Sequence, residues 1–312
     1  MLGSVRLRFA AVSTRAGLLF AALGILWGIP YLLIKVAVED LAPSTIVLAR
    51  TVLAAALLVP LAAARGQLRP ALRRWPMIAL FAVVEMAIPW PLLGYAEIHL
   101  PSSLAGLLIA AVPLVGALLV RFGPERERLD ARRGTGLLIG LAGVAALVGF
   151  HVEGGEALAV LALGGVVLGY AVGPVLLSRH LSDLPGLGVI ALALSISAGL
   201  SAPLGLVQAP RRWPSADVTL AVVALALFCT AAAFLVFFAL IAEIGPVRAS
   251  VVTYVNPAVA LLLGALVLDE RVTAVTGAGF ALILLGSVLA TGSGTPAVAL
   301  APAAPDEGAG LA

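Results

Sequence analysis

The chain has 312 residues, of which 62% are hydrophobic and 11% are charged, whereas a typical soluble domain is roughly 45–50% apolar and about 25% charged. So few charged side chains cannot cover the surface of a water-soluble protein of this size, and lipid must be the solvent for most of the chain. The single cysteine, Cys229, and the three histidines exclude a disulfide framework and leave too few ligands for a typical metal or redox centre. We therefore expect no cofactor and no metal.

Apolar stretches of about 20 residues, long enough to cross a bilayer, follow one another along most of the chain. Ten are predicted, at residues 17–36, 43–63, 76–96, 101–120, 134–150, 157–178, 186–207, 218–241, 247–267 and 273–291. Their short connections leave no room for an inserted soluble domain. Residues 293–312, rich in Gly, Ala and Pro, are predicted to be a disordered tail. The sequence thus predicts an all-α integral membrane protein.

The placement of basic residues predicts its orientation, because cytoplasmic loops carry an excess of Lys and Arg. In the first half, arginines gather before residue 16, between 65 and 74, and between 121 and 133, whereas the opposite loops carry only Lys35. We therefore expect residues 1–16 to be a cytoplasmic segment and both termini to be cytoplasmic, in a multi-pass protein of the cell (inner) membrane. The arginines flank spans rather than form one basic groove, so we expect no nucleic-acid partner.

An internal repeat relates the two halves. ERLDARRGTGLLIGLAGVAALVG (127–149) and ERVTAVTGAGFALILLGSVLATG (270–292) share Glu, Arg, Ala and several Gly at an offset of 143 residues. Nearby offsets pair Pro30 with Pro174 and Pro113 with Pro257. A chance likeness of Leu/Ala/Gly-rich helices would not match glycines, prolines and charges together. We therefore predict two five-helix units, 17–150 and 157–292, which are inverted relative to each other because five is odd.

Inverted repeats provide two nearly equal packings of one scaffold, which alternating access requires. The segments WGIPYLLIKVAVEDLAPSTIVLARTVLAAALL, GLLIAAVPLVGALLV and TYVNPAVALLLGALVLDERVTAVTGAGFALILLGSVLATG resemble both halves of an EamA-type transporter of the drug/metabolite transporter superfamily, over residues 17–292. The resemblance implies ten helices, cytoplasmic termini and secondary-active carriage, often export, of small organic metabolites such as amino acids or drugs. It leaves the substrate, the direction, the coupling ion and the oligomeric state open.

Prolines inside the predicted spans mark bends that free a backbone carbonyl toward a cavity or a neighbour. Pro30, Pro113, Pro174 and Pro257 are therefore candidates for helix breaks that line a cavity, although each could merely shape helix packing. In the family that the chain resembles, helices 1, 3, 4, 6, 8 and 9 line the central pathway. That set includes the predicted helices that carry these four prolines.

Aromatic and polar residues on the same spans form the candidate substrate-binding set, because they orient a solute in an otherwise apolar cavity. The set is Trp27, Tyr31, Glu85, Trp90, Tyr170, Tyr254 and Asn256. Trp27 and Tyr31 are four residues apart and are predicted to share a helix face. Trp90 could instead anchor the chain at the membrane interface, and Asn256 could instead join two helices by a hydrogen bond.

Arg50 and Glu85 lie well inside predicted spans, where a charge is costly. They could form a functional or a structural pair, Arg50 could reach the headgroups alone, or Glu85 could take up a proton as the coupling ion. The resembling family commonly has a basic residue where Arg50 stands, which favours a structural role for that charge. Glu85 has no acidic counterpart in the second repeat, which reads Cys229, Thr230 and Ala231 there.

Two other classes compete with a transporter: an intramembrane enzyme and a non-transporting membrane sensor or scaffold. An enzyme would need a nucleophile with its base, paired aspartates or a metal set inside the bilayer, and no such motif is present in the spans. A scaffold has no need for two exchangeable packings. We therefore expect no enzymatic activity, and we expect the lipid bilayer, a small-molecule substrate and, if transport is coupled, protons as partners.

Overall fold

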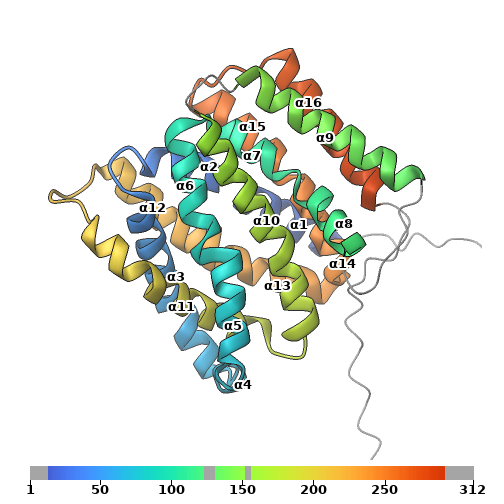
Figure 1. Ribbon diagram of the computed structural model, residues 1–312. Coiled ribbons are helices and arrows are strands. Elements are labelled where there is room, and N and C mark those ends of the chain that lie inside the picture. The colour runs from blue at the N-terminus through green and yellow to red at the C-terminus, as the bar shows by residue number, and fades with distance from the viewer. Residues whose placement is uncertain (1–12, 123–130, 152–155, 292–312) are drawn as a thin grey trace, which may run out of the picture.

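The computed structural model of the chain describes residues 13–122, 131–151 and 156–291, and every regular element within them is helical (Figure 1). In that part of the chain, nine helical stretches are long and apolar enough to span a membrane, and one shorter apolar helix covers Val251–Val267. The protein is therefore an all-helical, multi-pass membrane protein. The predicted tail, 293–312, and most of the N-terminal segment, 1–16, lie outside the described residues.

The elements of the first half are α1 (Thr14–Gly28), α2 (Pro30–Ala37), α3 (Pro43–Ala64), α4 (Leu68–Arg73), α5 (Trp75–Ala82), η1 (Val83–Ala87), α6 (Pro89–His99), α7 (Ser102–Ile109), α8 (Val112–Phe122) and α9 (Ala131–His151). The second half comprises α10 (Ala157–His180), α11 (Gly186–Val207), α12 (Ala216–Ala226), η2 (Leu227–Ala232), α13 (Ala233–Ile244), α14 (Pro246–Ala249), η3 (Ser250–Tyr254), α15 (Asn256–Val267) and α16 (Ala274–Thr291).

Helix interruptions recur at matched places in the two halves. A π-helical turn, a rare structure in proteins, divides the third span of each half, as η1 between α5 and α6 and as η2 between α12 and α13. The next span breaks just before a proline in both halves, at Pro113 and at Pro257. Pro30 likewise begins a new helix, α2. Pro174, which we predicted as a helix break, lies inside α10, which continues without interruption. One missing N–H frees the carbonyl of the preceding turn but need not end the helix.

The two halves pack against each other reciprocally. α9 lies along α16 and α3 along α11, so these helices contact their own counterparts in the other half, and α7 packs along α15, the second part of the matching span (Figure 1). The remaining spans exchange partners: α10 packs on α6, while α1 and α2 pack on α13 and α12. A two-fold relation between the halves would produce this pattern of reciprocal contacts.

The α9–α16 contact depends on the glycines that repeat in the sequence. A Cβ atom added at Gly286 would lie 2.4 Å from the backbone nitrogen of Gly140, and one added at Gly143 would lie 2.7 Å from the carbonyl oxygen of Gly279. The helix backbones therefore touch directly, as small residues permit in membrane proteins, where lipid supplies no hydrophobic drive for helix association.

Polar contacts join the halves at both ends of the bundle. At one end, the Asp40 carboxylate accepts a hydrogen bond of 2.9 Å from the Ser215 backbone N–H, which helps to lower the pKa of this exposed carboxyl. At the other end, Arg74 donates a hydrogen bond of 2.8 Å to the Asp183 carboxylate and another of 2.8 Å to the His180 carbonyl. Each contact reaches the residue that precedes a helix of the other half, α12 or α5.

Two glutamates near the start of α7 have opposite environments. The Glu270 carboxylate accepts hydrogen bonds from the backbone N–H groups of Ser102 (2.7 Å) and Ser103 (2.9 Å), and so caps α7. Glu97 is completely buried, and among the described residues neither of its carboxyl oxygens has a hydrogen-bond partner. Lys35 instead donates to the backbone carbonyls of Glu97 (2.6 Å) and Leu100 (2.9 Å) at the end of α6.

We expect Gly286→Ala to destabilise the protein, because the added methyl group would overlap the backbone of α9, and overpacking typically costs about 1–3 kcal/mol. The matched control is Gly277→Ala on the same helix, since a Cβ atom at Gly277 meets no atom within 4 Å. Thermal unfolding of the purified protein in detergent should show a lower midpoint for Gly286→Ala alone. Equal midpoints for the two variants would contradict this account of the α9–α16 contact.

The two glutamates should also respond differently to neutralisation. Glu270→Gln should lower the thermal midpoint, by an amount that corresponds to roughly 1 kcal/mol, because a neutral side chain caps the positive end of α7 less well. Glu97→Gln should leave the midpoint unchanged or raise it, because it replaces a buried carboxyl group that has no hydrogen-bond partner. A larger loss for Glu97→Gln than for Glu270→Gln would show that these assignments are wrong.

Candidate functional site

Arg50 of α3 lies at the contact between the two halves and is held by side chains from both. It is only 7% exposed, its Nε–H donates a hydrogen bond of 2.6 Å to the Thr230 hydroxyl of η2, and its guanidinium carbon lies 3.9 Å from the centre of the Trp90 ring. The Thr230 hydroxyl in turn donates a hydrogen bond of 2.8 Å to the backbone carbonyl of Leu225. This carbonyl lies five residues earlier, which is also the spacing of the backbone hydrogen bonds in a π-turn. The π-turn therefore leaves the Thr230 oxygen free to accept from Arg50.

Arg50 also lines a small cavity. The cavity beside Arg50 and Trp90 has a volume of about 10 Å³ and is closed by apolar side chains and Gly94, so it has room for about one water molecule. Within the described residues, no acidic side chain lies at ion-pair distance from Arg50. The Arg50 charge is therefore oriented by neutral groups, and its outer N–H groups have no protein acceptor in that part of the chain.

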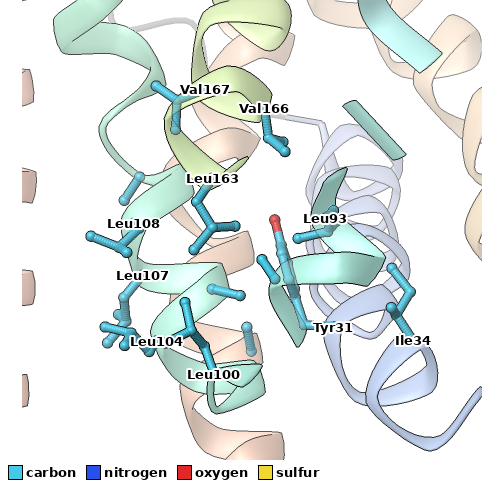
Figure 2. Close-up of a cluster of buried hydrophobic side chains, with 14 of the residues drawn as sticks. Tyr31, Ile34, Leu93, Leu100, Leu104, Leu107, Leu108, Leu163, Val166 and Val167 are labelled. Carbon is cyan, nitrogen blue, oxygen red and sulfur yellow. The ribbon is translucent and has the colours of Figure 1, made fainter. Parts of the chain in front are cut away.

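Two tyrosines lie within electrostatic range of Arg50. Tyr31 of α2 is buried among apolar side chains of α6, α7 and α10, with its hydroxyl group directed toward the Val166 side of this cluster (Figure 2). Tyr170 of α10 interacts with the side chain of Trp90 and lies within electrostatic range of Arg50 and Tyr31. We call Tyr31, Arg50, Trp90, Tyr170 and Thr230 the central cluster. It combines three residues of the predicted substrate-binding set with the arginine to which we assigned a structural role.

Glu85, on η1, lies beside the central cluster without pairing with Arg50. It lies within electrostatic range of Tyr170, and its carboxyl group occupies the space in which a side chain at Gly173 of α10 would begin. The buried Oε2 atom of Glu85 has no hydrogen-bond partner among the described residues. An ion pair between Arg50 and Glu85, one of the alternatives left open by the sequence, is therefore absent from this conformation.

The other predicted residues lie away from the central cluster. The Trp27 ring packs against Phe234 and Phe237 of α13, with ring centres 6.0 and 5.0 Å apart. Trp27 and Tyr31 belong to different apolar clusters, although the i→i−4 hydrogen bonds of Ile29 and Leu33 continue the helical backbone past Pro30. The hydroxyl groups of Tyr254 and Thr291 lie 3.2 Å apart. Asn256 begins α15, and its buried Oδ1 has no partner in the described residues.

Sequence reasoning missed two members of this region. Thr230 lies in an apolar run and looks like an ordinary helix residue until η2 turns it toward Arg50. Glu97 lies one residue beyond the third predicted span, 76–96, and the sequence assigned it no role, yet it is fully buried. The available signal was a carboxylate only two residues before His99, inside an otherwise apolar helix.

The comparisons with known proteins agree with this architecture. The EamA-like transporter family matches the chain twice, over residues 14–149 and 157–292. The uncharacterized inner membrane transporter YedA of Escherichia coli K12 is 32% identical over 292 residues, which cover 91% of this chain and 93% of YedA. A probable terminal-alkyne amino-acid exporter of Streptantibioticus cattleyicolor is 29% identical, over 84% of this chain and 89% of the exporter.

A solved structure shares the fold. A crystal structure with 26% sequence identity superposes with a TM-score of 0.64 and covers 88% of this chain and 96% of its own. The family match spans most of the chain in two copies, and the apolar helices are long enough to cross a bilayer. The chain belongs to the EamA-like transporter family and is a multi-pass transporter of the plasma membrane.

Proposed function

We propose that this protein is a secondary-active carrier that exports small organic metabolites, such as amino acids or drugs, by alternating access. The observation that carries the proposal is the reciprocal packing of the two halves around the central cluster. Carriers of this kind place the solute near the bilayer midplane, between repeats that rock against each other. The Streptantibioticus relative is named as a probable exporter of an amino acid, which supports both the direction and the solute class.

Two inverted five-helix repeats account for the packing if the shorter apolar helix Val251–Val267, formed by η3 and α15, also crosses the membrane. It would be the ninth span along the chain and would bring the total to ten. The tetrapeptide Arg-Arg-Trp-Pro occurs at 73–76, before the third span of the first half, and again at 211–214, before the third span of the second half. In inverted repeats, these two copies lie on opposite sides of the membrane. Ten spans put both termini on the same side, and the basic loops of the first half favour the cytoplasmic side.

The contacts at the two ends of the bundle would act as alternating closures. Asp40 and Asp183 occupy matched positions, 143 residues apart, and each is followed by Leu. Asp40 bonds to the residue before α12, and Asp183 bonds to the residue before α5. Breaking one contact while the other holds would open one side only.

We interpret the present conformation as closed to solutes. The cavity beside Arg50 has a volume of about 10 Å³, whereas pockets for drug-sized ligands measure roughly 300 Å³ or more. The helices around the central cluster must therefore separate before a metabolite can enter. The exposed end contacts suit such a movement, because surface ion pairs contribute little stability and break readily.

Transport should be measured in proteoliposomes loaded with a panel of amino acids, nucleosides, aromatic metabolites and lipophilic drugs, with and without a pH gradient. We expect saturable flux of at least one class.

If Glu85 carries the coupling proton, Glu85→Gln should abolish the stimulation of flux by the pH gradient but retain counterflow. The control variant Glu39→Gln, at an exposed loop glutamate, should behave like the wild type. We expect Asn256→Ala to lower flux without changing that stimulation, because it removes the polar group at the helix break. Flux of no panel member would contradict the carrier proposal, and unchanged stimulation in Glu85→Gln would remove the coupling role.

The inverted arrangement predicts opposite labelling of the two Arg-Arg-Trp-Pro copies. Arg73→Cys and Arg211→Cys should be made in a Cys229→Ala background and exposed to a membrane-impermeant maleimide on intact cells. Both positions are exposed, so we expect position 211 to react from outside and position 73 only after permeabilisation. Reaction of both from the same side would overturn the proposed topology.

A further inference from the structure

We propose that the Arg50 guanidinium is the anion-binding subsite of the carrier and binds the carboxylate group of the transported solute. This inference rests on the proposed function and narrows its substrate class to carboxylate-bearing solutes, amino acids among them. It replaces the structural role that the sequence suggested for Arg50. The observation behind it is a buried cation that is held in place by neutral groups and faces a cavity.

A purely structural arginine inside a membrane protein is normally paired with an acidic side chain or with backbone carbonyls, because an unpaired buried charge is costly. Arg50 has neither kind of partner among the described residues: its one hydrogen bond there goes to the Thr230 hydroxyl, and the Trp90 ring covers it. Glu97 and the Oε2 atom of Glu85 are buried too, but neither glutamate is within ion-pair distance of Arg50. The counter-charge of this cation must therefore come from outside the described protein residues.

The contacts that hold Arg50 leave one way for a carboxylate to bind its guanidinium group. Thr230 occupies the Nε–H, so the side-on approach that uses Nε and one terminal nitrogen is blocked. The two terminal nitrogens remain as a planar fork, which matches the two oxygens of a carboxylate. Because Trp90 stacks on the guanidinium, it restricts rotation of the fork and covers part of its surface.

The surroundings favour a single negative charge on an organic solute. Tyr31 and Tyr170 lie within electrostatic range of Arg50 and add no negative charge there while their hydroxyl groups are protonated. Besides Arg50 and Trp90, the groups that border the cavity are apolar side chains and Gly94, which would contact the carbon skeleton of the solute. No second basic residue belongs to the central cluster, so a dianionic phosphate group would keep an uncompensated charge in this low-dielectric site.

The test compares ligands that differ only in the group offered to Arg50. Purified full-length protein in lipid nanodiscs should be titrated with benzoate, benzamide, benzylamine and phenyl phosphate, with quenching of tryptophan fluorescence as the measure of binding. We expect benzoate to bind at least about tenfold more tightly than benzamide, because a hydrogen bond to a charged group is worth about 1.5–3 kcal/mol. Equal binding of benzoate and benzamide, tighter binding of phenyl phosphate than of benzoate, or no binding of benzoate would each overturn the proposal.

Variants then assign the preference to Arg50. Arg50→Gln should weaken benzoate binding to the level of benzamide binding and leave benzamide binding unchanged. Arg50→Lys should restore part of the preference for benzoate. Thr230→Val should weaken benzoate binding several-fold, because the guanidinium loses the hydrogen bond that orients it. The matched control is Arg212→Gln, at an exposed arginine, which should bind like the wild type. A benzoate preference that survives in Arg50→Gln would contradict the proposal. If Arg50→Gln fails to fold, as judged by thermal unfolding, Arg50→Lys and Thr230→Val decide: wild-type preference in both contradicts the subsite.

Transport assays separate this inference from the proposed function. Benzoate binding that depends on Arg50, without flux of any solute in proteoliposomes, would refute the carrier and leave the anion subsite standing. Saturable flux of amines or neutral solutes that is unchanged in Arg50→Gln would refute the subsite and leave the carrier standing.

Discussion

The interior of a bilayer offers no water to polar groups, and this constraint organises the whole protein. Each backbone N–H and C=O in a span must find its partner within a helix, so departures from helical geometry are tolerated only where neighbouring groups or a cavity compensate for them. Here the departures are concentrated around the central cluster. η1 carries Glu85 and leads directly into Pro89 and Trp90, and η2 carries Thr230. Two of these irregular turns therefore bring Glu85 and Thr230 close to Arg50, which itself lies on the uninterrupted helix α3.

The two halves share a scaffold but not its chemistry. α3 and α11 begin and end 143 residues apart, yet the position that matches Arg50 is Ala193, and the position that matches Glu85 lies in a run of Cys229, Thr230 and Ala231. The first half thus supplies the charge, and the second half supplies the neutral hydroxyl that orients it. The two family copies therefore contribute different side chains to the central cluster, and the site is asymmetric.

Rigid and breakable contacts between the halves are segregated. Along α9 and α16 the backbones meet through glycines, so any sliding would require a new set of close contacts. At the ends of the bundle the contacts between the halves are hydrogen bonds that involve Asp40, Arg74 and Glu270, and the ion pair between Arg74 and Asp183 has side chains that are 48% and 58% exposed. Exposed pairs of this kind contribute at most about 1 kcal/mol, so they hold the halves together less firmly than the glycine contact does.

The sequence alone determined the solvent of the chain, most of its spans, the duplication and the family, because apolar length and glycine and proline spacing are local properties of a membrane helix. It also identified Tyr31, Trp90, Tyr170 and Arg50 individually. Only the tertiary structure decided that Arg50 lies against Trp90 with both tyrosines within electrostatic range, that Trp27 packs elsewhere, that α10 passes through Pro174 unbroken and that Arg50 and Glu85 do not pair. Those outcomes depend on which side chains of one half face the other half. A π-turn or a helix break changes the direction in which the following side chains point, and the sequence of one span does not show by how much.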